Sequence, residues 1–479
     1  MTLQVNLVEA TPTIAGRGEA PRSGVPALAV LLVAGLAVRL ALWLAFRDAP
    51  ITIWDEKDYD AIARTLVASG EFGFEPGQLV SLRPPLYPAL VAVVYAVAGL
   101  GNFAAVRLLQ ILLSLATVGV VYALGATVAS RRVALWAAGL CCFYPSLLGY
   151  NNLLLSETLF TLLLTGTCYC AVRAFQAGSV GWALAAGLAL GLAALTRSVV
   201  WLTPPLLAGF LLLTMRVSWG RRLVAAVALV AGFVVVVGPW SVRNTRLQKT
   251  FVAVDVMGGR NFMMGNYRYT PLYRSWDAIA LEGEQSWAHE VFMTYPPEDR
   301  PTQGFVDKLA LKQGLAFVRA NPGLTLKRDT IKFFDFWGLE RELVAGAGAA
   351  HGGSLSKPAL LGLTALIVGA YVTVLFLGVY GAFVAPPADR RALWLFLAVI
   401  TYVCAMHTLT FGHSRYHLPL VPLIAVFAAG AITQARSIWR QRYRPAFVAA
   451  TGVCAALVVG WVWLFVAVDW DLLAAALRS

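Results

Sequence analysis

The chain has 479 residues, of which 59% are hydrophobic and only 13% are charged, and its mean hydropathy is +0.70. A soluble protein of this length carries about 25% charged residues, so the composition excludes a soluble enzyme and predicts an all-α polytopic membrane protein. The net charge of +13 does not indicate nucleic-acid binding, because the basic residues cluster between apolar segments, as they do in cytoplasmic loops.

Stretches of about twenty apolar residues predict eleven membrane helices. They are expected near 25–46, 104–128, 133–149, 153–173, 180–196, 198–215, 222–240, 357–384, 392–412, 416–435 and 446–468. The loops that hold Arg131, Arg216 and Arg390 fall on one side, which the positive-inside rule makes the cytoplasm. The first span is expected to stay uncleaved, after a cytoplasmic tail over residues 1–24.

The same alternation divides the rest of the chain into three parts. Residues 25–240 are predicted to form a transmembrane catalytic module that includes an outer loop at 47–103. Residues 241–356 follow the seventh helix as an extracytoplasmic segment, and residues 357–479 hold the C-terminal helices. Residues 86–101 are apolar enough to span, but a span here would turn every later arginine-rich loop outward, so we expect an interfacial helix.

An acidic stretch follows directly after the first apolar segment. Residues 54–60 place four carboxylates within six residues, and the aromatic side chains of Trp54 and Tyr59 flank Asp55 and Glu56. Carboxylates cannot enter a bilayer cheaply, so this stretch must lie at or outside the membrane boundary. A carboxylate there can deprotonate an incoming hydroxyl or amine, which predicts a catalytic role for Asp55 and Glu56.

Three arginines are expected at the same outer face. Arg83 lies on the first outer loop, Arg243 at the end of the seventh span and Arg415 between the ninth and tenth spans. The planar forks of arginine match phosphate oxygens, so we predict that these three bind a lipid phosphate. Each also has a simpler interpretation, because a long basic side chain at a membrane edge can reach head groups without a catalytic role.

Further polar residues on this face are predicted to contact the substrate: Tyr59, Glu157, Asn261, His413, Tyr416 and His417. Glu157 can instead be a helix N-terminal carboxylate favoured by the helix dipole. The spacing of His413 and His417 would suit a zinc site on a helix, but no third ligand is evident nearby, so no metal is predicted. The sequence has no phosphate-cradling or dinucleotide-binding glycine motif, and therefore no cofactor is expected.

Four motifs, taken in order, resemble the GT-C superfamily of membrane glycosyltransferases. They are Asp55-Glu56-x-x-Tyr59, Arg83-Pro84-Pro85-Leu86-Tyr87, Leu155-Ser156-Glu157-Thr158-Leu159, and Pro239-Trp240-Ser241-Val242-Arg243-Asn244 continuing through Gly258-Gly259-x-Asn261 to Gly265-Asn266. The ending Arg415-Tyr416-His417-Leu418-Pro419 is also similar. The resemblance is to glycosyltransferase family 39, which holds protein O-mannosyltransferases, and to the bacterial lipid A aminoarabinose transferases.

The resemblance implies a GT-C-type bundle and an inverting transfer of a sugar from a polyprenyl-phosphate donor. It implies that Asp55 corresponds to the family's catalytic carboxylate, and that Arg83 replaces a lysine that contacts lipid phosphate. Two positions depart from the pattern. Asp58 stands where an arginine is expected, and Leu82 stands where the aminoarabinose transferases have a glutamate that helps to bind zinc, which speaks against a metal here.

The sequence therefore predicts a glycosyltransferase of the inner (plasma) membrane whose site faces the extracytoplasmic side. Its partners would be a polyprenyl-phosphate-linked sugar, membrane lipids, and a lipid, glycan or protein acceptor. The rival interpretation is a flippase or transporter of lipid-linked sugars, which would also need an apolar bundle with basic contacts. Transporters often contain repeats and place ionisable groups near the bilayer midplane, whereas here these groups gather at one face.

Overall fold

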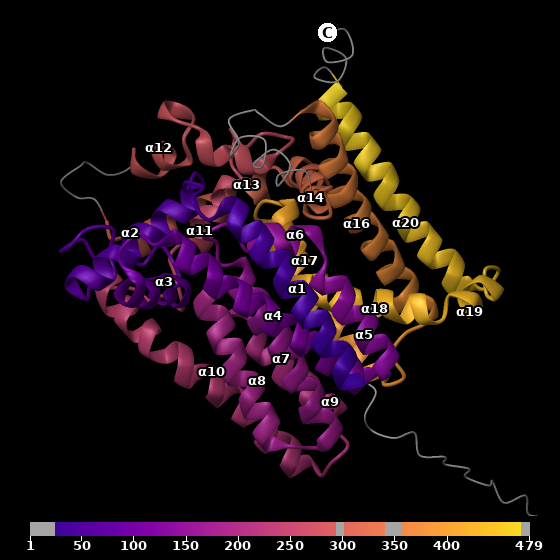
Figure 1. The fold of residues 1–479 in the computed structure, drawn as a ribbon. Helices are drawn as coiled ribbons and strands as arrows, with labels where there is room; N and C mark the ends of the chain where they lie inside the picture. Colours follow the sequence, from indigo (N-terminus) through magenta and orange to yellow (C-terminus); the bar gives the residue numbers. More distant parts are fainter. Residues whose placement is uncertain (1–23, 294–300, 341–355, 471–479) are drawn as a thin grey trace, which may run out of the picture.

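The computed structural model describes residues 24–293, 301–340 and 356–470, and almost all of this chain is helical (Figure 1). The first half contains α1 Gly24–Phe46, α2 Trp54–Ser69, α3 Leu86–Ala98, α4 Phe103–Val128, α5 Arg131–Cys142, α6 Pro145–Tyr150, α7 Glu157–Ala177, α8 Val180–Thr196, η1 Ser198–Val200, α9 Thr203–Thr214 and α10 Trp219–Gln248. The second half contains α11 Gly258–Met264, η2 Ser275–Ala280, η3 Gly283–Gln285, α12 Trp287–Phe292, α13 Gln303–Ala320, α14 Pro322–Phe336, α16 Lys357–Val384, α17 Arg390–Leu409, η5 Ser414–Leu420, α18 Val421–Thr433, α19 Ala435–Arg440, α20 Pro445–Leu464 and η6 Phe465–Asp469.

Eight helical segments of the described chain are long and apolar enough to cross a membrane, which confirms the all-helical, polytopic class. They are Pro26–Phe46, Phe103–Val128, Glu157–Ala177, Trp219–Gln248, Lys357–Val384, Arg390–Leu409, Ser414–Thr433 and Pro445–Val468. Three expected spans are too short or too interrupted to be among these eight segments. The span at 180–196 is a helix of 17 residues, the one at 198–215 contains a helix of 12 residues, and the one at 133–149 is broken between α5 and α6.

The break between α5 and α6 has a local cause. Pro145 lies at the start of α6, and the preceding Tyr144 has an extended backbone with φ −68° and ψ 116°. A proline disfavours the helical conformation in the residue before it, so α5 ends at Cys142 and the chain restarts as a short helix. The count of eleven spans stays a prediction, as does the division of the chain into a tail, a catalytic module and an outer segment. Nearly all of the predicted tail lies outside the described residues.

The bundle is held by helices that approach closely at small residues. α8 packs along α10, where a side chain at Gly187 would run into the carbonyl of Leu229. α16 packs along α18 in the same way, with Gly381 against the carbonyl of Phe427. Small residues let helix backbones come together in a membrane, where van der Waals packing replaces the hydrophobic effect between helices. These contacts fix the helix ends on which the polar residues lie.

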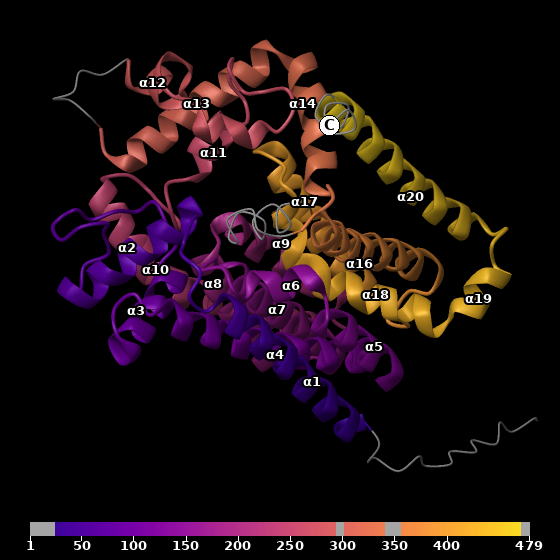
Figure 2. The same cartoon turned by 45° about the horizontal axis from the view of Figure 1, so that its top comes forward.

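The segment after α10 forms a cap beside one end of the bundle. Figures 1 and 2 both show α11, α12 and α13 gathered on one side of the molecule, away from α5 and α9. α11 packs on α13, and Gln303 at the start of α13 accepts a hydrogen bond of 3.0 Å from the Ser81 amide in the loop before α3. The cap and the first loop are therefore joined at the same end of the bundle.

Helix α3 bears directly on the topology prediction. It covers Leu86–Ala98, a helix of 13 residues, and its short length agrees with an interfacial position. Length alone does not separate it from α9, however, because α9 has 12 residues and was predicted to span. The membrane position of α3 therefore stays a prediction.

Candidate active site

The first turn of α2 brings Asp55 between two arginines from distant parts of the chain. The Nη2 atom of Arg83, in the loop before α3, donates to Asp55 Oδ1 at 2.7 Å. The Nη2 atom of Arg415, in η5, donates to Asp55 Oδ2 at 2.7 Å. Arg83 also donates to Asp58 through Nε at 2.9 Å and Nη2 at 2.7 Å. The predicted convergence of Asp55, Arg83 and Arg415 is thus present in the structure, although their roles stay a prediction.

A second charged pair lies next to the first. Glu157, at the start of α7, is 2.7 Å from Nη1 of Arg197, which follows the end of α8. Arg415 Nε is 3.7 Å from the same Glu157 oxygen, so this guanidinium connects the two pairs. The ring of Tyr416 lies beneath both guanidinium groups, at 5.3 Å from Arg197 and 5.2 Å from Arg415. The ring of His407 stacks on the ring of Tyr416, and their centroids are 4.1 Å apart.

These contacts define a charged cluster, which consists of Asp55, Asp58, Arg83, Glu157, Arg197 and Arg415. Its three arginines and three carboxylates balance when all are ionised. The Glu157 side chain is only 3% exposed, and those of the arginines are each 18% exposed. Charges this poorly solvated cost free energy unless they are paired, so each member depends on the others.

The pKa of Asp55 lies well below the usual range of an aspartate. Burial acts to raise it, but the positive charges of Arg415 and Arg83 more than offset that effect. Burial raises the pKa of Asp58, even though Arg83 acts in the opposite direction. Burial acts to lower the pKa of Arg83, but the neighbouring Asp55, Tyr59 and Asp58 raise it above the ordinary value. Paired with these two arginines, Asp55 is therefore a firmly ionised carboxylate and a weak base.

Glu56 has a different environment from Asp55. Its Oε2 accepts hydrogen bonds of 3.0 Å from the amides of Thr52 and Ile53, which cap the start of α2. Its Oε1 accepts a bond of 2.9 Å from the Leu154 amide, and the residue is 1% exposed. A buried carboxylate with three backbone donors fixes the position of α2 against the loop before α7. The geometry favours this structural role over the catalytic one predicted from the sequence.

Arg243 is also placed apart from the charged cluster. Its guanidinium donates to the carbonyls of Val80 and Phe72 at 2.6 and 3.2 Å, and lies 4.7 Å above the ring of Trp240. These contacts tie α10 to the first outer loop. They speak for the anchoring interpretation of Arg243 and leave Arg197 as the third arginine of the cluster.

The predicted substrate contacts separate into two groups. Tyr59, Glu157 and Tyr416 lie at the cluster, with the Tyr59 hydroxyl 3.4 Å from Ser156 Oγ and its ring 5.8 Å from the Arg83 guanidinium. His413 lies beside the cluster and packs edge-on against Trp276. The remaining two are elsewhere: Asn261 is half-buried on α11, and His417 points into a separate buried pocket.

Two members of this site were not predicted from the sequence. Arg197 was not among the predicted site residues, although a charge that directly follows an apolar helix was a usable signal. Asp255, between α10 and α11, accepts hydrogen bonds from Ser198 and from the Met257 amide, the latter at 3.2 Å. Burial raises the pKa of Asp255 to about 6. No sequence pattern around it marks it as unusual.

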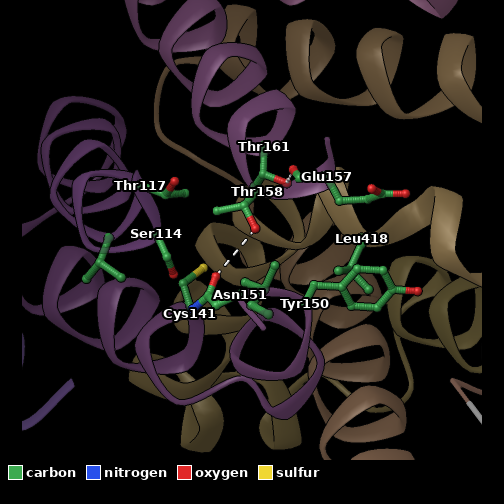
Figure 3. Close-up of a pocket in the computed structure, with 11 residues that line it drawn as sticks. Ser114, Thr117, Cys141, Tyr150, Asn151, Glu157, Thr158, Thr161 and Leu418 are labelled. Carbon is green, nitrogen blue, oxygen red and sulfur yellow. Dashed lines mark hydrogen bonds between the residues drawn. The ribbon is translucent and has the colours of Figure 1, made fainter. Parts of the chain in front are cut away.

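A small cavity lies beside Glu157 (Figure 3). Its volume is about 10 Å³, which is room for one water molecule. Glu157, Thr158 and Thr161 on α7 and Ser114 on α4 contribute to its lining, and Thr158 donates to Asn151 at 3.4 Å (Figure 3). The lining also includes the apolar side chains of Val118, Leu147 and Leu418, so polar and apolar groups meet next to Glu157.

A larger, apolar cavity of about 110 Å³ lies between α7, α8, α9 and α17. Its lining includes Leu164, Leu190, Val200, Leu207, Phe210 and Tyr402. Val200 is three residues beyond Arg197, so one end of this cavity approaches the charged cluster along the chain. Among the described residues, no group of three or more His, Cys, Asp or Glu side chains is arranged to hold a metal ion.

Comparison with protein families finds a match over part of this chain. The matching family is described as dolichyl-phosphate-mannose-protein mannosyltransferase, and it matches residues 82–241, from just before Arg83 to the C-terminal part of α10. The match covers about a third of the chain. No curated protein matches the sequence.

Several solved structures align with most of this chain at low sequence identity. The Archaeoglobus fulgidus oligosaccharyltransferase, in complex with zinc and sulfate, is 14% identical with a TM-score of 0.47, over 91% of this chain and 52% of that one. ArnT from Cupriavidus metallidurans in the apo state is 19% identical with a TM-score of 0.39, over 86% and 78%. The arabinosyltransferase EmbB from Mycobacterium smegmatis is 16% identical with a TM-score of 0.34, over 88% and 43%. The chain spans about half the length of the archaeal enzyme.

Proposed function

We propose that this protein transfers a sugar, with inversion, from a polyprenyl-phosphate donor to a lipid, glycan or protein acceptor at the extracytoplasmic face. The observation that carries the proposal is the position of Asp55, held between Arg83 and Arg415 at 2.7 Å from each. A carboxylate and convergent guanidinium groups are what this reaction needs. The carboxylate takes a proton from the acceptor, and the guanidinium groups stabilise a leaving phosphate.

The donor phosphate would bind to the three arginines of the charged cluster. Arg83, Arg197 and Arg415 come from different elements, and their planar forks can orient a phosphate that a single flexible side chain would hold loosely. In the structure the carboxylates of the cluster occupy these forks. The singly charged phosphodiester of an incoming donor, and the phosphate dianion that forms when the sugar leaves, would therefore have to share the arginines with Asp55, Asp58 and Glu157.

This competition gives a physical reason for ordered activation. While Asp55 is paired with both arginines, its low pKa makes it a poor base. When the phosphate draws Arg83 and Arg415 toward itself, Asp55 loses part of its positive surroundings and its basicity rises. The acceptor hydroxyl would then be deprotonated only when a donor is present.

The chemical step balances without a covalent enzyme intermediate. The acceptor oxygen forms a bond to the anomeric carbon as the bond from that carbon to the phosphate oxygen breaks. The acceptor proton passes to Asp55, and the electron pair of the broken bond leaves with the polyprenyl phosphate. The arginines stabilise the charge that develops on the leaving oxygen, which is the usual effect of preorganised positive groups.

The apolar cavity between α7, α8, α9 and α17 supports a lipid-linked donor. Its lining continues from Val200, close along the chain to Arg197, toward Leu207 and Phe210 on α9. A polyprenyl chain there would place its phosphate near the charged cluster while the hydrocarbon stays out of water. A soluble sugar donor would gain nothing from such a cavity.

The arginine distribution supports an extracytoplasmic site. Glu157 begins α7 and Arg197 follows α8, so the cluster lies at those ends of these helices. Arg131 and Arg390 begin α5 and α17 at the opposite ends of the predicted spans. The positive-inside rule assigns the ends rich in arginine to the cytoplasm, which leaves the cluster facing outward.

Product analysis of the purified protein in lipid nanodiscs tests the proposal. The full chain is incubated with defined polyprenyl-phosphate sugars and candidate acceptors, and we expect free polyprenyl phosphate and glycosylated acceptor in equal amounts. The flippase interpretation predicts that the donor changes leaflet in proteoliposomes and stays chemically intact. Donor movement without release of polyprenyl phosphate would overturn the transferase proposal in favour of that alternative.

A further inference from the structure

A second buried polar cluster lies on the far side of η5 from Asp55. His417 has no exposed surface, and its Nδ1 is 2.7 Å from the carbonyl oxygen of Phe336, the last residue of α14. Its Nε2 is 2.8 Å from Oε1 of Glu340, which is 4% exposed. Glu340 also accepts hydrogen bonds from the hydroxyls of Tyr144, at 2.9 Å, and Ser146. We call these four side chains, His417, Glu340, Tyr144 and Ser146, the buried clamp.

The hydrogen-bond partners determine where the protons lie. A carbonyl oxygen only accepts, so Nδ1 of His417 must carry a hydrogen and donate it to Phe336. Glu340 accepts hydrogen bonds from two hydroxyl groups, and its Oε1 faces Nε2 of His417 at 2.8 Å. Such a pair is strongly directional, because both ring nitrogens are committed to fixed oxygens.

The ring of His417 is also fixed by stacking. It lies nearly parallel to the ring of Tyr371 on α16, with 4.7 Å between centroids and 15° between planes. Trp337 stacks at 5.9 Å and 11°, and the Tyr371 hydroxyl donates to the Trp337 carbonyl at 2.6 Å. His417 therefore has no freedom to reach the charged cluster, which is why it does not serve as the substrate contact predicted from the sequence.

The position of the buried clamp gives it a connection to the reaction. Arg415 and His417 lie two residues apart on η5, and they face opposite ways, one toward Asp55 and one toward Glu340. Tyr416 between them lies under the guanidinium of Arg197. A short 3₁₀ turn has no long hydrogen-bond ladder of its own, so its position depends on its side-chain contacts.

We propose that His417 and Glu340 are positioning residues, which hold η5 so that Arg415 and Tyr416 meet the donor phosphate in a fixed geometry. Glu340 follows α14, so the clamp also links the cap to the active site. This inference rests on the proposed function for its catalytic readout. Its structural content, that Glu340 fixes the position of Tyr416, does not.

A double-mutant cycle between Glu340 and Arg415 tests whether the clamp acts through the arginine. We expect Glu340→Ala to lower the transfer rate by about 10-fold to 100-fold, the range for loss of a buried charged hydrogen bond. In an Arg415→Ala background the same change should cost less than about threefold, because the residue that it positions is already missing. Equal losses in both backgrounds would mean a general loss of stability and would overturn the proposal.

Two further variants complete this measurement. Glu340→Gln should keep most of the activity, because its amide can donate to a neutral His417 while Nδ1 still donates to Phe336. Asp389→Ala is the matched control, since it also removes a carboxylate from a side-chain ion pair, here one with Arg391 at 2.8 Å at the start of α17. It should leave transfer unchanged. A Glu340→Gln enzyme as impaired as Glu340→Ala would contradict the positioning geometry.

A spectroscopic readout works even if the protein transfers no sugar. With 3-fluorotyrosine placed at Tyr416, the ¹⁹F resonance reports on a ring held 4.1 Å from His407 and beneath Arg197 and Arg415. We expect a single sharp resonance in the otherwise unmodified protein in nanodiscs, and a shifted, broadened one in Glu340→Ala. An identical spectrum in Glu340→Ala overturns the proposal, whereas absent transfer with the expected shift counts only against the proposed function.

Discussion

Replacing Asp55 by asparagine should change donor binding and sugar transfer in opposite directions. The substitution keeps the size of the side chain and removes its negative charge. Asp55 now neutralises Arg83 and Arg415, so its loss frees both guanidinium groups for a phosphate. The same loss removes the base. We therefore expect Asp55→Asn to bind undecaprenyl phosphate more tightly than the unmodified protein and to transfer sugar more slowly.

The size of the affinity gain follows from the two contacts. Asp55 accepts two charge-assisted hydrogen bonds of 2.7 Å, and a bond to a charged group contributes about 1.5–3 kcal/mol. Asparagine keeps one carbonyl oxygen, so it still holds one arginine as a neutral acceptor. Partial exposure of these side chains weakens the remaining difference to about 1–2 kcal/mol, or roughly 5-fold to 30-fold in dissociation constant. Transfer should fall by about 10²-fold or more.

Both quantities are measured on the same nanodisc preparation. Undecaprenyl phosphate is titrated to obtain a dissociation constant, and initial transfer rates are taken at saturating donor. Asp389→Asn serves as the control, because Asp389 pairs with Arg391 and lies away from the charged cluster. An Asp55→Asn variant with unchanged or weaker phosphate affinity would refute the competition argument. Near-normal turnover in that variant would separately refute Asp55 as the base.

Three further predictions concern the arginines, the topology and the pH dependence. Arg83→Ala and Arg415→Ala should each weaken undecaprenyl phosphate binding by about 1.5–3 kcal/mol. The double variant should lose less than the sum of the two losses, because both arginines act on one phosphate. Strict additivity would exclude a shared phosphate. Leu100 follows α3 and its side chain is 56% exposed. In a cysteine-free background, Leu100→Cys should react with an impermeant thiol reagent added from outside. Labelling only from the inner face would make α3 a span. The pKa of Asp255 is raised to about 6 in the folded protein, so as the pH rises its carboxyl group ionises in the unfolded chain before it does in the folded one. The free energy of unfolding should therefore fall by about 3 kcal/mol as the pH rises from about 4 to 6. Asp255→Asn should abolish that fall in thermal unfolding, and an unchanged pH dependence would contradict it.

The convergence of Asp55, Arg83 and Arg415 could be predicted because the membrane reduces the problem to two sides. Hydropathy marks the spans, the arginine-rich loops assign the faces, and residues 360 positions apart then share one face. The resemblance to glycosyltransferases added the pairing of an acid with the arginine before a Pro-Pro sequence. Neither argument contains distances, so neither could separate residues at the site from residues merely near it.

Glu56, Arg243 and His417 show where that reasoning stops. Each is a polar residue on the expected face, and each forms hydrogen bonds with a group that the sequence does not reveal. Glu56 binds the Leu154 amide 98 residues away, and Arg243 binds the Phe72 carbonyl 171 residues away. Backbone groups occur at every position, so a residue that binds them leaves no pattern in the sequence.

The breaks in the predicted spans have a more visible origin. Hydropathy averages over a window and does not register a single proline, so 133–149 scored as one span although Pro145 ends the helical run before it. Pro204 and Pro205 similarly lie near the beginning of α9, after the short turn η1. A proline within an apolar run was thus a usable signal for a shorter helix.

Asp58 was the departure from the family pattern that the sequence could not explain, and the charge balance of the site accounts for it. Where an arginine was expected, Asp58 instead receives two hydrogen bonds from Arg83, at 2.9 and 2.7 Å. With Asp55 and Glu157 it gives three carboxylates for three arginines. An arginine at this position would leave a strong excess of positive charge in a poorly solvated site, which is costly without a ligand. The aspartate makes the charged cluster electrically neutral. Under the proposed function, the phosphate would therefore bind by exchanging partners rather than by filling an open positive pocket.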